Sequence, residues 1–372
     1  MFRKLLISLF LTIIPIISCH ADDVRAMWVV RYALNSVPET QGIIETAKSL
    51  NITDLYVQVW ALGQRYGYSG NGSKDEPLTN LVKIAHKEHI RVHAWLNTLF
   101  IWANDHPPKD NDHIFNISKE AFLRSKSDTN APEYSKYKEK GIEGCFIDPL
   151  SKENLLDLKM VISELLTTYH VDGIHLDYFR MPSIEYSFSP MGRTAFFVEN
   201  WFDPIEIYNN PFDNRISSNI TIYQERADKY KVFLQSNITS LLRDFEFYIK
   251  QIDNTITLSV AVKPDLYNAR NYYAQDWLSW LKLGYCDKVV MMNYQTDFSL
   301  FLGNLQKAAE QNLNQNVVIG VSTYNQGYEA VTLRLEVIKK MKFSGYSLFS
   351  YNYLRENANY LYKLVYLAKN EN

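Results

Sequence analysis

Residues 171–182, VDGIHLDYFRMP, decide the fold that the sequence predicts. A short apolar run bounded by polar breaks is typical of a buried strand. Side chains alternate along a strand, so one face is apolar and the other carries Gly173, His175 and Asp177. Two such faces fit a barrel of parallel strands, in which helices cover the outside and chemistry lies at the C-terminal strand ends. Asp177 is at such an end, and we take it as the centre of the candidate site.

Strands and helices alternate about eight times along the chain. Besides the central strand, strands are predicted at residues 25–30, 53–60, 90–97, 255–263, 288–294, 316–324 and 345–351. This alternation predicts an α/β fold of the (β/α)8 TIM-barrel type. A dinucleotide-binding fold is disfavoured, because residues 31–35 after the first strand carry no glycine.

Two long insertions are predicted at the C-terminal face of the barrel. Residues 98–144 are polar and have no clear period, and residues 183–219 are rich in aromatic side chains. We expect residues 22–372 to form one barrel domain that includes both insertions.

Residues 1–21 are typical of a secretory signal. Arg3 and Lys4 precede an apolar run that is too short to span a bilayer comfortably. Cys19 fits a bacterial lipoprotein cleavage box, which would leave it acylated and attached to a membrane. Ordinary cleavage after Ala21 is the alternative. Either route predicts a mature chain that is secreted or held at the cell envelope.

Composition excludes several classes of function. The 372 residues are 47% hydrophobic and 22% charged, which excludes a mostly disordered chain. A formal net charge of −2 argues against nucleic acid as a partner. No Cys/His cluster has zinc spacing, so neither a metal nor a cofactor is expected. Cys145 and Cys286 are too few to predict a disulfide. The oligomeric state is left open.

Polar and aromatic residues gather on the strands beside the central one. The alternation places His93, Trp95 and Asn97 on one face of their strand, and Gln58 and Trp60 on one face of another. A histidine in a barrel lumen is more often a satisfied core residue than a catalyst. His93 and His175 could nevertheless tune the pKa of a neighbouring carboxyl.

Five segments in a set order resemble the glycosyl-hydrolase-like ten family of secreted bacterial proteins. They are RAMWVV (25–30), HAWLN (93–97), IDP (147–149), VDGIHLDYFRMP (171–182) and VVMMNY (289–294). The resemblance spans roughly residues 24–351 and implies a TIM barrel with glycosidase-type action on extracellular or cell-wall glycans. It also implies site roles for Gln58, His93, Trp95, Asn97, Asp148, Asp177, Tyr178 and Tyr294. Asn293 stands where the family often has Gln.

Glycoside hydrolysis usually needs two carboxyl groups, one of which is protonated. Asp177 is the first candidate, and its alternative role is a hydrogen-bond hub. Asp297 and Asp148 are the preferred partners. Asp265 and Glu185 are further options near the mouth of the barrel, which is the end where the strands have their C-termini. The chitinase-type motif DxxDxDxE ends on Phe179 here, so its catalytic Glu is missing.

The sequence therefore predicts a secreted or lipid-anchored glycoside hydrolase that cleaves a polysaccharide, plausibly a bacterial cell-wall or surface glycan. Flat aromatic rings such as Trp60, Trp95 and Trp201 would pack on sugar faces, with Tyr178, Asn293 and Tyr294 beside them. The alternatives are a non-catalytic glycan-binding barrel and an envelope scaffold without a sugar site.

Overall fold

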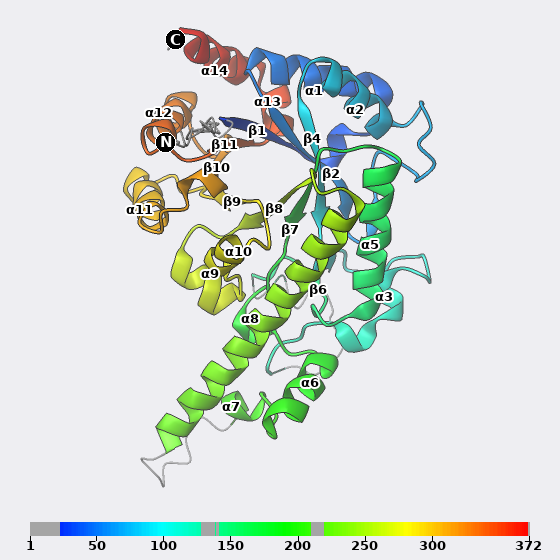
Figure 1. Ribbon diagram of the computed structural model, residues 1–372, viewed down its shortest axis with the longest axis vertical. Coiled ribbons are helices and arrows are strands. Elements are labelled where there is room, and N and C mark those ends of the chain that lie inside the picture. Colours follow the sequence, from blue (N-terminus) through cyan, green and yellow to red (C-terminus); the bar gives the residue numbers. More distant parts are fainter. Residues whose placement is uncertain (1–22, 128–137, 139–140, 210–218, 371–372) are drawn as a thin grey trace, which may run out of the picture.

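The computed structural model describes residues 23–127, 138, 141–209 and 219–370. The predicted secretory signal and Cys19 lie outside these described residues. Figure 1 shows strands at the centre of the molecule with helices arranged around them, and a long helix that runs from the barrel into a projecting lower part.

Eight parallel strands form a closed barrel. In order around the sheet they are β1 (Val24–Val29), β2 (Asp54–Ala61), β4 (Arg91–Asn97), β7 (Gly173–Asp177), β8 (Thr257–Val262), β9 (Lys288–Met292), β10 (Val317–Ser322) and β11 (Gly345–Phe349). The sheet closes because β1 pairs in parallel with both β2 and β11. This confirms the predicted (β/α)8 barrel.

Helices connect successive strands and cover the outside. They are α1 (Val37–Ser49), α2 (Pro77–Lys87), α5 (Lys152–Thr167), α8 (Asn219–Ile252), α9 (Leu266–Tyr273), α10 (Trp277–Leu283), α11 (Phe298–Ala309), α12 (Tyr328–Lys340), α13 (Tyr351–Glu356) and α14 (Ala358–Asn370). Short 3-10 turns lie at Arg31–Ala33 and Asn314–Asn316. Within the described ranges, none of the helices has the length and hydropathy needed to cross a bilayer.

The two long insertions follow the C-terminal ends of β4 and β7. The first contains β5 (Phe100–Trp102), α3 (Ile114–Ile117), a 3-10 turn (Lys119–Ala121) and β6 (Cys145–Phe146), which pairs with β5. The second contains a 3-10 turn (Ile184–Tyr186), α6 (Pro190–Asn200) and α7 (Glu206–Asn209). A bridge between Arg124 and Phe188 joins the two insertions. In Figure 1, α6 and α7 lie beside the lower end of α8, away from the barrel strands.

The barrel lumen is a packed aromatic core. Trp28, Tyr56 and Trp95 cluster there with small and aliphatic side chains of other strands. His175 is 0% exposed, accepts a hydrogen bond from the Trp28 indole (3.2 Å) and stacks on Tyr56 (4.3 Å between ring centroids). Burial, with the charge of His93, holds the pKa of His175 well below its usual value. His175 is therefore a neutral core residue that stabilises the barrel interior.

A register shift separates Gln58 from Trp60. The pairing of β2 with β4 is irregular between these two residues, so Trp60 aligns with Leu96. Trp60 is buried in the core cluster that lies between strands and helices, and the Arg65 guanidinium lies 5.9 Å from its ring. The prediction that Gln58 and Trp60 share a face fails, because alternation alone cannot anticipate a bulge. A two-residue strand, β3 (Gln64–Arg65), pairs with the end of β2 at this point.

A charged network fills the N-terminal end of the barrel strands, opposite Asp177. The Asp54 carboxylate accepts hydrogen bonds from His93 Nε2 (2.7 Å) and Arg91 Nε (2.8 Å). Although burial opposes ionisation, His93 and Arg91 hold the pKa of Asp54 below its usual value. His93 thus belongs to this network. The imidazole lies over Gly173, where an added Cβ would overlap the ring and approach the Thr257 carbonyl oxygen to 2.8 Å.

Replacing Gly173 with Ala should lower the free energy of unfolding by about 3 kcal/mol, because the methyl group would displace His93 from Asp54. Gly303→Ala in α11 is the matched control. A Cβ at Gly303 meets no atom within 4 Å, so helix propensity should raise stability by about 1 kcal/mol. Denaturant unfolding of both variants measures the difference. Equal stability of the two variants would contradict the packing of His93 against Gly173 described above.

Candidate active site

Asp177 lies at the C-terminal end of β7, on the floor of the barrel mouth. Its carboxyl accepts hydrogen bonds from the Trp95 indole (3.1 Å) and from the backbone N–H of Tyr178 (2.6 Å). Its own carbonyl accepts bonds from the backbone and hydroxyl of Thr98. The residue is 9% exposed, and burial raises the carboxyl pKa despite these donors. A carboxyl held in this way keeps its proton to a higher pH than an ordinary aspartate does.

A hydrogen-bonded chain of three side chains lies beside this carboxyl. Asn97 aligns with Asp177 in the pairing of β4 with β7. Gln58 donates to the Asn97 amide oxygen (3.2 Å) and accepts from the Arg31 guanidinium (3.0 Å). Gln58 and Asn97 are buried and Arg31 is partly exposed. The chain fixes the amide orientations and places a cation at the edge of the mouth.

Two cations and a second carboxylate form the opposite wall. Arg180 Nη2 lies 2.7 Å from the Glu143 carboxylate, and the guanidinium packs 5.3 Å from the Tyr178 ring centroid. Lys263 Nζ lies 4.7 Å from the centroid of Tyr273. Burial lowers the pKa of Lys263 to about 8, with the charge of Arg180 acting in the same direction. Lys263 follows the last residue of β8, so it lies at the C-terminal end of that strand.

The charges of Arg180 and Lys263 lower the pKa values of both Asp177 and Glu143. For Asp177 burial is the larger effect, and its pKa is raised. Burial is the largest single effect on Glu143 as well, but the charge and hydrogen bond of Arg180, a backbone hydrogen bond and the charge of Lys263 together outweigh it and lower the pKa. The pKa values of two carboxyl groups near the same cations are therefore shifted in opposite directions, which is the pattern of an acid and a base.

Aromatic side chains close the mouth on the side of β9, β10 and β11. The Tyr294 ring lies 5.5 Å from Phe349 and 6.5 Å from Tyr324. Burial, with the charge of Asp177, raises the pKa of Tyr294 well above its usual value, so its phenol stays a donor. Tyr324 is 49% exposed. The mouth thus has an aromatic wall facing two carboxyl groups and their cations.

The fold and this mouth define a glycosidase-type barrel, in which side chains at the C-terminal strand ends surround a carboxyl group. The chain belongs to the Glycosyl hydrolase-like 10 family, whose model matches residues 23–334. This confirms the resemblance seen in the sequence. A search of curated proteins gave no match.

Solved structures with a similar fold include three glycosidases. The catalytic domain of β-amylase from Paenibacillus polymyxa matches with a TM-score of 0.57 and 12% identity over 90% of this chain and 94% of that chain. β-Galactosidase from Bacillus circulans sp. alkalophilus gives a TM-score of 0.58 and 12% identity over 89% of this chain and 50% of that one. Endo-1,4-β-mannanase from Rhizomucor miehei gives a TM-score of 0.53 and 12% identity over 88% of this chain and 86% of that chain. At this identity the likeness concerns the fold.

Asp148 lies in a buried junction between the two insertions. Its carboxyl accepts hydrogen bonds from the Ser189 hydroxyl (2.7 Å) and the Leu150 backbone N–H (2.9 Å). Ser189 in turn caps α6 by accepting from the backbone N–H of Gly192. Burial raises the pKa of Asp148 to about 6. These contacts give Asp148 a structural role in the insertions.

Other predicted residues stabilise helix ends at the rim. Asp297 is exposed and caps α11 by accepting from the backbone N–H of Leu300 (2.9 Å), and Asp265 caps α9 in the same way. Asn293 is fully buried and bonds to the Phe301 carbonyl oxygen (3.0 Å). Glu185 is exposed beside Lys126.

Trp201 lies apart from the mouth. It is 82% exposed at the C-terminal end of α6, where its backbone adopts a left-handed conformation. Cys145 and Cys286 are buried free thiols. Across the part of the chain that the structure describes, no three His, Cys, Asp or Glu side chains are grouped to hold a metal ion.

The structure therefore brings together Gln58, Trp95, Asn97, Asp177, Tyr178 and Tyr294 among the predicted site residues. Arg31, Glu143, Arg180 and Lys263 join them and were not predicted. Lys263 is the last residue of a predicted strand, and that position is the signal that could have identified it. Glu143 lies within the first predicted insertion and carries no such signal.

Replacing Asp148 with Asn should change the pH dependence of stability. Since the folded pKa of about 6 exceeds the ordinary 3.8, the folded state binds this proton more tightly. The resulting stability is complete below pH 3.8 and is lost as the pH rises through 6. Two pKa units correspond to at most about 3 kcal/mol.

Unfolding of Asp148→Asn and wild type at about pH 4 and about pH 8 measures this effect. The variant should gain stability relative to wild type at the higher pH. A loss of turnover with no change in the stability difference would instead assign Asp148 to catalysis.

Proposed function

We propose that this protein is a glycoside hydrolase that cleaves a polysaccharide by paired-carboxylate acid/base chemistry. The observation that carries the proposal is the arrangement of two carboxyl groups at the barrel mouth, with Asp177 buried against two N–H donors and Glu143 paired with Arg180 at 2.7 Å. The pKa values of the two groups are shifted in opposite directions, which agrees with this arrangement. The family and the glycosidase-type fold support the reaction class.

Asp177 is the proton donor in this proposal. Its raised pKa keeps a proton available, and its position at a strand end directs that proton to an oxygen in the mouth. The Trp95 and Tyr178 N–H groups stabilise the carboxylate left after proton transfer. Glu143 is held ionised by Arg180 and would attack the anomeric carbon or activate water.

The mouth also suits a sugar ring. Tyr324 is exposed and Tyr294 is partly exposed beside it, and flat rings pack well on the apolar faces of sugars. Arg31 and Lys263 form no ion pair within the described part of the chain, although each borders the mouth. Such cations favour a glycan that carries acidic groups, as bacterial wall and surface glycans can. A secreted or lipid-anchored location, suggested by residues 1–21, would bring the protein to that substrate.

A non-catalytic glycan-binding barrel is the second candidate. The observation in its favour is that Asp177 is only 9% exposed and both of its carboxyl oxygens already accept hydrogen bonds. In that role Asp177 would fix the positions of Trp95 and Tyr178 and accept hydrogen bonds from sugar hydroxyls without donating a proton.

Asp177→Asn should reduce sugar release by a factor of about 10² to 10⁴ while the thermal unfolding midpoint stays close to that of wild type. The amide preserves the shape of the side chain but carries no transferable proton. The measurement is the rate of reducing-end formation on a panel of purified glycans, including cell-wall glycan. A binding protein would release no sugar in either form and would only lose affinity.

Glu143→Gln should reduce the rate to a similar extent, because the neutral amide cannot serve as nucleophile or base. Asp297→Asn, which can still cap α11, tests the partner that the sequence favoured. Loss of turnover in Asp297→Asn with activity retained in Glu143→Gln would reverse the assignment.

The rate should follow a bell-shaped pH profile. It falls at low pH as Glu143 is protonated and at high pH as Asp177 loses its proton. Because the Lys263 charge lowers the pKa of Asp177, Lys263→Met should move the alkaline limb to higher pH, and Lys263→Arg should leave it in place. A limb that does not move in Lys263→Met would remove Asp177 as the group that titrates there.

A further inference from the structure

A hollow lined by tyrosines lies on the rim of the barrel, beside the mouth. It has a volume of about 470 Å³, and its lining residues are Tyr328, Tyr353, Glu356, Asn357, Ala358, Asn359, Tyr360 and Lys363. They come from α12, α13 and α14, which follow the C-terminal ends of β10 and β11. The hollow is therefore at the same end of the barrel as Asp177.

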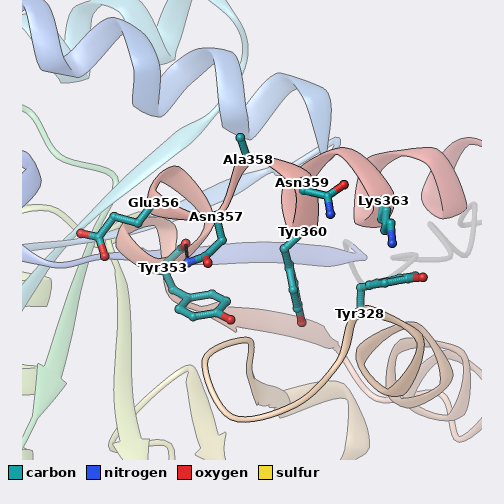
Figure 2. Close-up of a pocket in the computed structure, with 8 residues that line it drawn as sticks. All are labelled: Tyr328, Tyr353, Glu356, Asn357, Ala358, Asn359, Tyr360 and Lys363. Atoms are coloured by element: carbon teal, nitrogen blue, oxygen red, sulfur yellow. Dashed lines mark hydrogen bonds between the residues drawn. The ribbon is translucent and has the colours of Figure 1, made fainter.

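The Tyr360 ring is nearly perpendicular to the other two tyrosine rings of the hollow. Tyr360 lies 6.2 Å from Tyr328 and 5.5 Å from Tyr353, with interplanar angles of 89° and 86°. Figure 2 shows Tyr353 and Tyr360 extending from their helices toward the chain that leads into α12, where Tyr328 lies. The Tyr360 hydroxyl donates to the Gln326 carbonyl oxygen (3.1 Å), which fixes its ring.

Polar groups border these rings. Asn357 donates to the Tyr353 carbonyl oxygen, so its side-chain oxygen is left to accept. Asn359 is exposed, and Lys363 Nζ lies 4.9 Å from the Tyr328 centroid. The lining includes one acidic side chain, Glu356, and one basic side chain, Lys363, so its formal net charge is zero. Fixed aromatic faces with amides at their edges are the chemistry that recognises a sugar.

One short loop joins the hollow to the mouth. Residues 323–327 connect β10 to α12, and the loop presents Tyr324 to Tyr294 and Phe349 in the mouth. The next part of the loop, at Gln326, is bonded by Tyr360 of the hollow. Tyr324 and Tyr328 are four positions apart, so their Cα atoms are separated by at most about 14 Å. An extended glycan can therefore contact both regions at once.

We propose that the hollow is a second carbohydrate-binding site, which holds a distant part of the polysaccharide chain while another part lies in the mouth. The choice of occupant rests on the proposed function, and the site itself rests on the geometry of the hollow. Binding there raises the local concentration of substrate at the mouth without taking part in the bond cleavage.

Retention on insoluble, protein-free bacterial cell-wall glycan tests the proposal in an Asp177→Asn background, where cleavage cannot remove the ligand. Adding Tyr353→Ala should weaken retention about tenfold, which corresponds to about 1.4 kcal/mol, because the variant loses one aromatic contact with the glycan. Tyr353→Phe keeps the ring and should keep retention. Tyr362→Ala is the matched control, because Tyr362 is a 69% exposed tyrosine of α14 outside the hollow.

In the active protein, Tyr353→Ala should raise KM for long soluble glycan fragments and leave kcat/KM for disaccharides unchanged. Ala358→Arg, which fills the hollow from an exposed helix position, gives a second route if Tyr353→Ala fails to fold. Equal retention of Tyr353→Ala, Ala358→Arg and Tyr362→Ala would overturn the proposal. Retention lost only in the hollow variants, without turnover by wild type, would sustain this site and reject the hydrolase.

Discussion

Desolvation of the Asp177 carboxyl is the constraint on which the site depends. The packed lumen below it, with Trp28, Tyr56 and His175, excludes water from one side, and Trp95 covers another. Burial alone would leave an inert neutral acid. Two N–H donors and the nearby positive charge of Arg180 bring the ionised form within reach, so that a proton can leave the group and return. A barrel filled with small aliphatic side chains would bury the carboxyl without supplying the N–H donor that Trp95 provides.

The barrel and its insertions contribute different halves of the site. The strand ends supply Asp177, Asn97 and Lys263 with fixed backbone positions, because each strand is paired on both sides. Glu143 comes from the first insertion, immediately before β6, and reaches the mouth through Arg180. The pairing of β5 with β6 and the Asp148–Ser189 contact hold the insertions against the barrel. Residues far from the mouth can thus affect the distance between the two carboxyl groups.

Periodicity was sufficient to predict the barrel and the position of Asp177, because the side chains of a regular strand alternate and parallel strands end on one face. Periodicity could not predict the positions of side chains at a β-bulge or in the insertions, where the backbone is irregular. Because of the bulge after Gln58, Trp60 points into the core between strands and helices instead of the lumen. Asp148 lies in a loop that leads into a helix. Glu143 could not be chosen from the sequence, since its role depends on a 2.7 Å contact with a residue 37 positions away. Contacts between insertions carry no periodic signal.

The arrangement of aromatic residues supports the proposal that the ligand is a long glycan. Inside the lumen the rings pack on one another and leave no space for a ligand, as Trp28 and Tyr56 do. At the rim the rings become partly exposed, first at Tyr324 and then at Tyr328, while remaining fixed by neighbours. Rigid exposed rings lose little conformational entropy on binding, and a row of them favours an extended ligand over a compact one. A polymer that crosses the rim uses this row, whereas a monosaccharide in the mouth would contact only its first member.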